Sequence, residues 1–292
     1  MRLSTSTNIY NFEQGVSYAL SMEDSVRVCA EAGYTYIDAN LCAQCRKDMP
    51  LSLDGWQPWA EGIRRLADSL NVRITQAHAY WHIGYAFSPQ GERLDGEWGE
   101  ELMRRSVVAA QILGVEWMVV HPMSLRRDDL YSASASAAYN YDFFSRWAET
   151  YERHSVGMAI ENMISRTAQM GYAADVEELA ALIDRIDHPM VGACLDTGHA
   201  HLSGLDVPAS VRLLGKRLKA THIADNHQNT DEHFAPFNGT IPWPEVMKAL
   251  RDIQYAHDFS FEIQNLTSCY PSAVQRPLIR FSYELGQYLM GL

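Results

Sequence analysis

Short apolar runs alternate with amphipathic segments along the chain, and this alternation is its main structural signal. Eight runs rich in β-branched residues are typical of buried strands: 2–8, 34–40, 72–79, 116–122, 156–162, 191–197, 218–225 and 259–264. Between them apolar residues recur at helical spacing, as in 21–33, 59–70, 101–114, 141–154, 175–186 and 243–253. Ser21 or Asp24 is a suitable N-cap for the first of these segments, and Gly33 a suitable end.

Strands that are apolar on both faces and are each followed by a helix favour a closed parallel barrel. The predicted fold class is therefore α/β, a single (β/α)8 TIM barrel that occupies residues 1–292 as one domain. A doubly wound open sheet is the alternative, but no glycine-rich phosphate loop follows the first strand. Residues 84–100, rich in glycine and polar residues, predict a long loop on the catalytic rim that could act as a lid.

The amino-acid composition limits the classes of partner that the protein can bind. The content of 47% hydrophobic residues supports a sizeable core, and the formal net charge of −12 argues against nucleic acid, whose affinity rests largely on Lys and Arg. No apolar signal core begins the chain and no run approaches bilayer length, so we expect a cytoplasmic protein without membrane contact.

Polar side chains gather at the ends of six predicted strands. They are His78, His121, Glu161, Asp196 with His199 just beyond, His222 and Glu262. Because the carboxyl ends of parallel barrel strands meet on one face, we expect these groups to ring one pocket. Taken singly, Asp196 before Thr197 could be only a helix N-cap, and a lone histidine is more often a hydrogen-bonded core residue. Their recurrence at equivalent strand ends favours a shared site.

Buried carboxylates that converge without a counter-charge are costly, and a divalent cation relieves that cost. Four successive strand ends supply three carboxylates and one imidazole: Glu161, Asp196, His222 and Glu262. This mixed oxygen and nitrogen set suits Mn²⁺, Mg²⁺ or Co²⁺, and Zn²⁺ is also possible. The sequence therefore predicts one divalent metal ion, and a small neutral or metal-chelated substrate suits the net charge of −12.

Several motifs resemble the sugar phosphate isomerase/epimerase family with the xylose-isomerase-like TIM barrel, a superfamily that includes the AP endonuclease family 2. They are AIEN (159–162), CLDTGHAH (194–201), THIADN (221–226), DEHFAPFNGTIPW (231–243) and SFEIQ (260–264). The resemblance implies the same four metal ligands and a substrate contact by His199. It also implies an enediolate reaction in which Glu161 and Glu262 transfer the proton, and a homo-oligomer, either a dimer or a tetramer.

The chain departs from the ketose epimerases of this family in one important place. They carry an arginine shortly after the seventh strand, and the stretch DNHQNTDEH (225–233) has none. Five further residues are candidates for substrate binding: His78, Trp81, His121, Asp231 and His233. Four of the five, all except Trp81, would also complete the ligand set of the trinuclear zinc endonucleases.

Four functions thus stay open. The first is a metal-dependent isomerase or epimerase of a small ketose, aldose or polyol-derived ketone. The second is a lyase or dehydratase on a keto-sugar, similar to inosose dehydratase or to the barrel subunit of C-glycoside-cleaving enzymes. The third is a zinc-dependent AP endonuclease, which the acidic charge disfavours. The fourth is a non-catalytic sugar-binding protein that kept the ligands. The sequence does not name the substrate.

Overall fold

The computed structural model describes residues 1–292 apart from 11, 14–15, 18–20, 81–95, 128–129 and 166–170. Its centre is an eight-stranded sheet in the order β11-β10-β9-β6-β5-β4-β1-β12, in which neighbouring strands are parallel. The strands are β1 Arg2–Ser6, β4 Tyr36–Asn40, β5 Arg73–His78, β6 Trp117–Val120, β9 Gly157–Glu161, β10 Val191–Asp196, β11 Leu218–His222 and β12 Asp258–Phe261. All eight predicted strands are confirmed.

The sheet closes on itself between its first and last members, β11 and β12. Ile223 pairs in parallel with Phe261 beyond the named strand of β11. Its N–H donates to the carbonyl of Ser260 at 2.8 Å, and its own carbonyl accepts from the N–H of Glu262 at 3.0 Å. The predicted (β/α)8 barrel is therefore confirmed.

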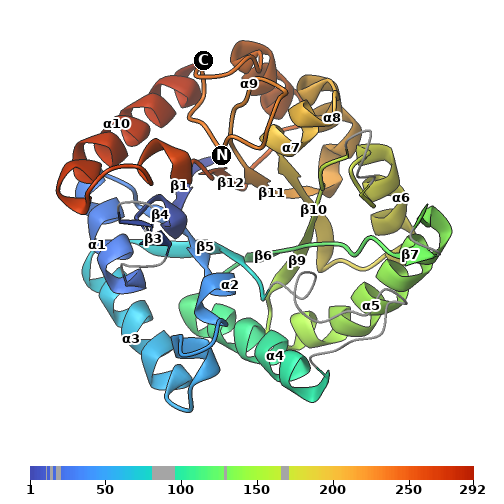
Figure 1. Cartoon of the computed structure of the whole chain (residues 1–292), viewed down its shortest axis with the longest axis horizontal. Coiled ribbons are helices and arrows are strands. Elements are labelled where there is room, and N and C mark those ends of the chain that lie inside the picture. The colour runs from blue at the N-terminus through green and yellow to red at the C-terminus, as the bar shows by residue number, and fades with distance from the viewer. Residues whose placement is uncertain (11, 14–15, 18–20, 81–95, 128–129, 166–170) are drawn as a thin grey trace.

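Helices surround the strands as an outer ring (Figure 1). Those that follow the barrel strands are α1 Met22–Ala32, α3 Trp56–Ser69, α4 Gly96–Leu113, α5 Ala133–Arg153, α6 Val176–Ile186, α8 Val207–Leu214, α9 Trp243–Asp252 and α10 Ser272–Gly291. Two short helices, α2 Leu41–Gln44 and α7 Thr197–Leu202, begin directly at strand ends. Among the described residues, no helix has both the length and the apolar run that crossing a bilayer would need.

Local sequence accounts for several boundaries. Ser21 caps α1 by accepting a hydrogen bond from the N–H of Asp24, and Gly33 ends the helix in the left-handed region at φ 113°. A Cβ at Gly33 would lie 2.8 Å from the ring of Tyr283, so only glycine fits there. The six predicted helical ranges include neither α8 nor α10, and Pro277 lies inside α10.

The predicted rim loop at 84–100 is shorter than expected at its C-terminal end. Residues 96–100 form the first turns of α4, in which Gly99 is buried. Residues 81–95, including the candidate Trp81, lie outside the described residues. Two short antiparallel pairs decorate the barrel: β2 Phe12–Glu13 with β3 Val16–Ser17, and β7 Arg126–Arg127 with β8 Leu130–Tyr131.

Polar residues fill part of the barrel. At the end where the strands begin, Arg2 Nε donates to Asp258 Oδ1 at 2.6 Å, and Thr75 Oγ1 donates to Asp258 Oδ2 at 2.6 Å. Further along, Val119, Ala159, Cys194 and Ala220 form a small apolar cluster that is separate from the main core. Cys194 is in register with Glu161, so this layer lies directly beside the strand ends.

Candidate active site

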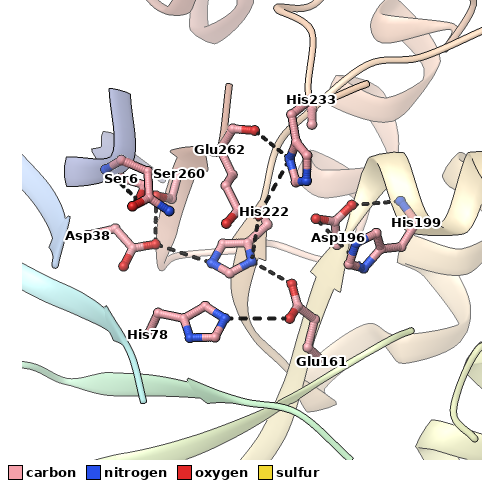
Figure 2. Close-up of polar contacts among 12 residues, drawn as sticks. Ser6, Asp38, His78, Glu161, Asp196, His199, His222, His233, Ser260 and Glu262 are labelled. Carbon is pink, nitrogen blue, oxygen red and sulfur yellow. Dashed lines mark hydrogen bonds and ion pairs between the residues drawn. The ribbon is translucent and has the colours of Figure 1, made fainter. Parts of the chain in front are cut away.

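Four predicted ligands converge where the barrel strands end. Glu161 ends β9, Asp196 ends β10, His222 ends β11, and Glu262 follows β12. These strands are neighbours in the closed sheet, so their last side chains enter one space. One potential ligand atom from each residue lies within 4.8 Å of the others, and all four side chains are buried (Figure 2).

The imidazole of His222 lies at the centre of this group. Its Nδ1 is 2.5 Å from Glu161 Oε1 and 3.4 Å from Glu262 Oε2. Its Nε2 is 3.3 Å from Asp38 Oδ2, on the opposite edge of the ring. Asp38, whose side chain is 1% exposed, was not among the residues predicted for the site. His222 is thus held between one carboxyl behind it and two in front.

The pKa shifts of the buried groups indicate that a positive charge would stabilise this site. Burial, together with neighbouring carboxylates, raises the pKa of both Asp196 and Glu262. Burial opposes the imidazolium of His222, yet the adjacent carboxylates, Glu262 foremost, raise its pKa well above the usual value. Burial also opposes ionisation of Glu161, but the charges of His222 and His121 bring its pKa below the usual range. Without a cation, a proton on His222 supplies the missing charge.

Asp196 has two roles in the structure. Its Oδ1 accepts a hydrogen bond from the N–H of His199 at 2.7 Å, so it is the N-cap of α7. Its Oδ2 is buried and has no hydrogen-bond partner within the described part of the chain. A buried carboxylate oxygen without a partner is costly. Asp196 Oδ2 and the side chains of Glu161, His222 and Glu262 together form a set of ligand atoms that fits a divalent cation.

Two further histidines adjoin Glu161. His121 Nε2 lies 2.6 Å from Glu161 Oε2, and His78 Nε2 lies 3.0 Å from His121 Nε2. The ring of His78 also stacks on that of His222, with centroids 5.7 Å apart. Burial and the neighbouring charge of His121 lower the pKa of His78 to about 4, so His78 is neutral at physiological pH. These three residues form a second possible metal-binding group.

A third group lies on the opposite side of the pocket and contains His199, Asp231 and His233. Asp231 Oδ2 is 3.0 Å from His233 Nε2 and 3.6 Å from His199 Nε2. Each imidazole also hydrogen-bonds through Nδ1 to a backbone carbonyl: His199 to Asn162 at 2.9 Å and His233 to Glu262 at 3.0 Å. The two rings are therefore fixed relative to the strand ends that carry the glutamates.

The pocket above these groups has a volume of about 330 Å³. Its walls also include residues outside the predicted set: Asn8, Asn40, Cys42, Arg46, Met163 and Ile164. All predicted site residues within the described chain come together at this pocket, with Asp196 and His222 buried beneath it. Arg46 lies on the loop after β4, a place where a single sequence offers no chemical pattern to mark it.

The model of the xylose isomerase-like TIM barrel family matches residues 26–284. The chain belongs to this family. An uncharacterized protein of Sinorhizobium fredii is 29% identical over 168 residues, which cover 56% of this chain and 52% of that protein. A D-psicose 3-epimerase of Enterocloster bolteae is 32% identical over 79 residues, which cover 27% of this chain and 25% of that protein. The match thus spans about half the length of the first relative and a quarter of the second.

Solved structures agree on the fold. A D-psicose 3-epimerase crystallised in the presence of D-fructose superimposes with a TM-score of 0.79 at 14% identity, covering 100% of both chains. The IOLI protein with a binding zinc atom gives a TM-score of 0.76 at 14% identity, covering 100% of this chain and 98% of that one. At this level of identity the likeness establishes the shared barrel.

Proposed function

We propose that the protein is a divalent-metal-dependent sugar isomerase or epimerase that acts on a small ketose, aldose or polyol-derived ketone. The observation that carries this proposal is the convergence of Glu161, Asp196, His222 and Glu262 within 4.8 Å in a buried site. The names of the epimerase relative and of the epimerase structure with the same barrel support it. We also propose that residues 1–292 act as one domain.

Glu161, Asp196, His222 and Glu262 would hold the metal ion, because they offer three carboxylates and one imidazole to a single point. When bound, the ion polarises a substrate carbonyl and stabilises negative charge on it. Manganese, magnesium, cobalt and zinc all suit this donor set. The zinc atom in the IOLI structure supports the last of these.

We propose that the two glutamates transfer the proton. Glu161 and Glu262 extend from β9 and from the end of β12, and their carboxylates reach His222 from two directions (Figure 2). A substrate in the pocket above would present the carbon next to its carbonyl to both. One glutamate would remove the proton from this carbon to give an enediolate, and the other glutamate would return a proton to it. Such positioned acid–base catalysis contributes about 10²–10⁴-fold.

The remaining residues would hold the substrate. His199 and His233 are oriented by the carbonyls of Asn162 and Glu262, and both face Asp231, so they present a fixed row of hydrogen-bonding groups along one wall. His78 and His121 present imidazoles on the opposite wall beside Glu161. Hydroxyl groups of a sugar can pair with both walls.

Exchange of substrate hydrogen in D₂O tests the proposal. The metal-loaded protein, incubated with a panel of ketoses and inososes, should incorporate one deuterium next to the carbonyl while the product otherwise keeps its mass. Glu161→Gln and Glu262→Gln should each slow exchange by at least 100-fold. Glu152→Gln, on the exposed side of α5, is the matched control and should not change the rate.

Three other results would each point to a different function. Loss of water or of an aglycone from the same substrates would identify a lyase, which begins with the same proton removal. Sugar binding that survives both glutamate substitutions, without turnover of any substrate, would indicate a binding protein. Cleavage of abasic DNA would support the endonuclease, against which the net charge of −12 argues.

The remaining proposals concern the oligomeric state, the location and the partners of the protein. We propose a homo-oligomer, either a dimer or a tetramer, in the cytoplasm, without nucleic-acid or membrane partners. Light scattering of the metal-loaded protein would give the oligomeric state directly.

A further inference from the structure

A second cavity of about 390 Å³ adjoins the active-site pocket. Its walls are Cys42, Cys45, Arg46, Lys47, Tyr80, Trp98 and Leu102. Two of these residues, Cys42 and Arg46, also line the active-site pocket. The two hollows therefore lie on either side of the same short segment, and we call the second one the distal cavity.

The chemistry of the distal cavity differs from that of the active-site pocket. The active-site pocket is walled mainly by carboxylates, imidazoles and amides. In the distal cavity, the described lining has no carboxylate, and it combines the aromatic rings of Tyr80 and Trp98 with the cationic Arg46 and Lys47. An apolar wall with a few hydrogen-bond donors is typical of a site for a ring with polar edges. A small sugar that chelates the metal would not need this second space.

Trp98 provides a rigid surface in this cavity. Trp98 is 47% exposed, so about half of its surface is open to solvent. The guanidinium of Arg105 lies 5.0 Å from the centre of the Trp98 ring. Arg105 is itself fixed, because it donates to Glu101 Oε1 at 2.7 Å and to the carbonyls of Leu51 and Leu53 at 3.1 and 3.0 Å. The indole is thus held in place by the protein while much of its surface stays available.

The two walls of the distal cavity are also joined to each other. Cys45, at the end of α2, lies 3.2 Å from Ser106 of α4 through its Sγ and the serine Oγ, and both residues are buried. The segment that carries Arg46 and the helix that carries Trp98 are therefore in direct contact. A preformed cavity binds a ligand without the cost of ordering its walls.

We propose that the distal cavity binds the second ring of an extended sugar, so that the substrate is a glycoside of a keto-sugar and not a free monosaccharide. The inference rests on the proposed function, because it takes the first ring to be chelated above Glu161, Asp196, His222 and Glu262. The apolar C–H face of the second ring would pack on Trp98 and Tyr80. Arg46, between the two cavities, and Lys47 would donate to hydroxyl and ring oxygens. Arg46 would then supply the cationic grip that is missing after β11.

Calorimetric titration of the metal-loaded protein tests this assignment. The probes are D-fructose, 6-O-α-D-glucosyl-D-fructose and D-fructose 6-phosphate, which share the ketose end and differ in what is attached to it. The variants are Trp98→Ala, Trp98→Phe and the control Phe281→Ala, which removes a similarly exposed ring from α10. The glucosyl compound should bind about tenfold more tightly than fructose, as expected for one well-packed ring. Trp98→Ala should abolish that gain without changing the Kd for fructose, and Trp98→Phe should keep most of it.

Other outcomes would overturn the inference. Equal Kd values for fructose and the glucosyl compound, or a gain that survives Trp98→Ala, would show that the cavity holds no second ring. A gain confined to the phosphate would show that Arg46 and Lys47 bind an anion instead. If fructose binds but the glucosyl compound binds no more tightly, only the proposed role of the distal cavity is wrong. If no sugar binds the loaded protein and no D₂O exchange occurs, the proposed function itself is wrong.

Discussion

Replacing Asp38 with asparagine would remove the negative charge that lies behind His222. In the native protein Asp38 Oδ2 accepts from Gln76 Nε2 at 2.8 Å and from Ser260 Oγ at 3.3 Å, and it lies 3.3 Å from His222 Nε2. A proton on Nε2 is therefore directed at Asp38. This leaves Nδ1 facing Glu161 and Glu262, as a metal ligand must.

The expected loss of metal affinity depends on which hydrogen bonds each substitution of Asp38 keeps. Asparagine keeps an oxygen acceptor for Nε2–H but loses the charge, and hydrogen bonds to charged groups are worth about 1 kcal/mol more than neutral ones. Its amide N–H₂ would also take the place of Asp38 Oδ1, which has no hydrogen-bond partner within the described residues. We expect Asp38→Asn to weaken metal binding about tenfold and Asp38→Ala about 100-fold, the range typical of groups that orient a ligand.

Competition with a chromophoric chelator measures the Kd for Zn²⁺ or Co²⁺ directly, without reference to activity. Asp258→Asn is the matched control, since it removes a buried carboxylate at the opposite end of the barrel and should leave the metal Kd unchanged. Glu161→Gln is the reference for loss of a ligand. If Asp38→Asn and Asp38→Ala bind metal as tightly as the native protein while Glu161→Gln does not, Asp38 does not orient His222.

Three further predictions follow from the same structure. Saturation with metal at about 1,000 times its Kd should stabilise the fold by about 4 kcal/mol and raise Tm by about 7 °C, and a chelator should reverse this; an unchanged Tm would mean that no ion binds the folded site. Burial raises the pKa of Asp258 to about 6 despite the nearby Arg2, so the folded state holds a proton that the unfolded state releases near pH 4. The native protein should therefore lose about 2 kcal/mol of stability relative to Asp258→Asn as pH rises from 4 to 6 in urea titrations; a difference of opposite sign would show that the attraction of Arg2 outweighs burial. His199→Ala should raise KM at least tenfold and leave metal content unchanged, because His199 faces the pocket and meets Asp196 through its backbone N–H; loss of the metal would refute a purely substrate-facing role.

Strand ends were the part of the site that sequence alone could predict. Glu161, Asp196 and His222 each terminate a strand whose apolar interior is evident from the pattern, and the shared geometry of parallel barrels places such ends together. Asp196 shows why a capping explanation and a site explanation need not compete. One oxygen caps α7, and the other remains for the site.

Asp38 and Arg46 were missed for different reasons. Asp38 lies within a predicted strand. The strand pattern alone does not predict whether this polar side chain points into the barrel or away from it, because that depends on the partner it contacts. Its partner is His222, on a strand that is distant in sequence and reaches it across the barrel interior. Arg46 lies on a loop, whose path depends on packing against α4 through the contact of Cys45 with Ser106.

The chain pattern by itself determined the order of strands and helices, the barrel class and the residues at each strand end, because periodicity and capping are local properties of the backbone. Tertiary structure decided which of those residues touch, that His222 is held between Asp38 and the two glutamates, and that a second, aromatic cavity adjoins the first. These features depend on closure of β11 against β12 and on loop packing, which are set by contacts between segments far apart in the sequence.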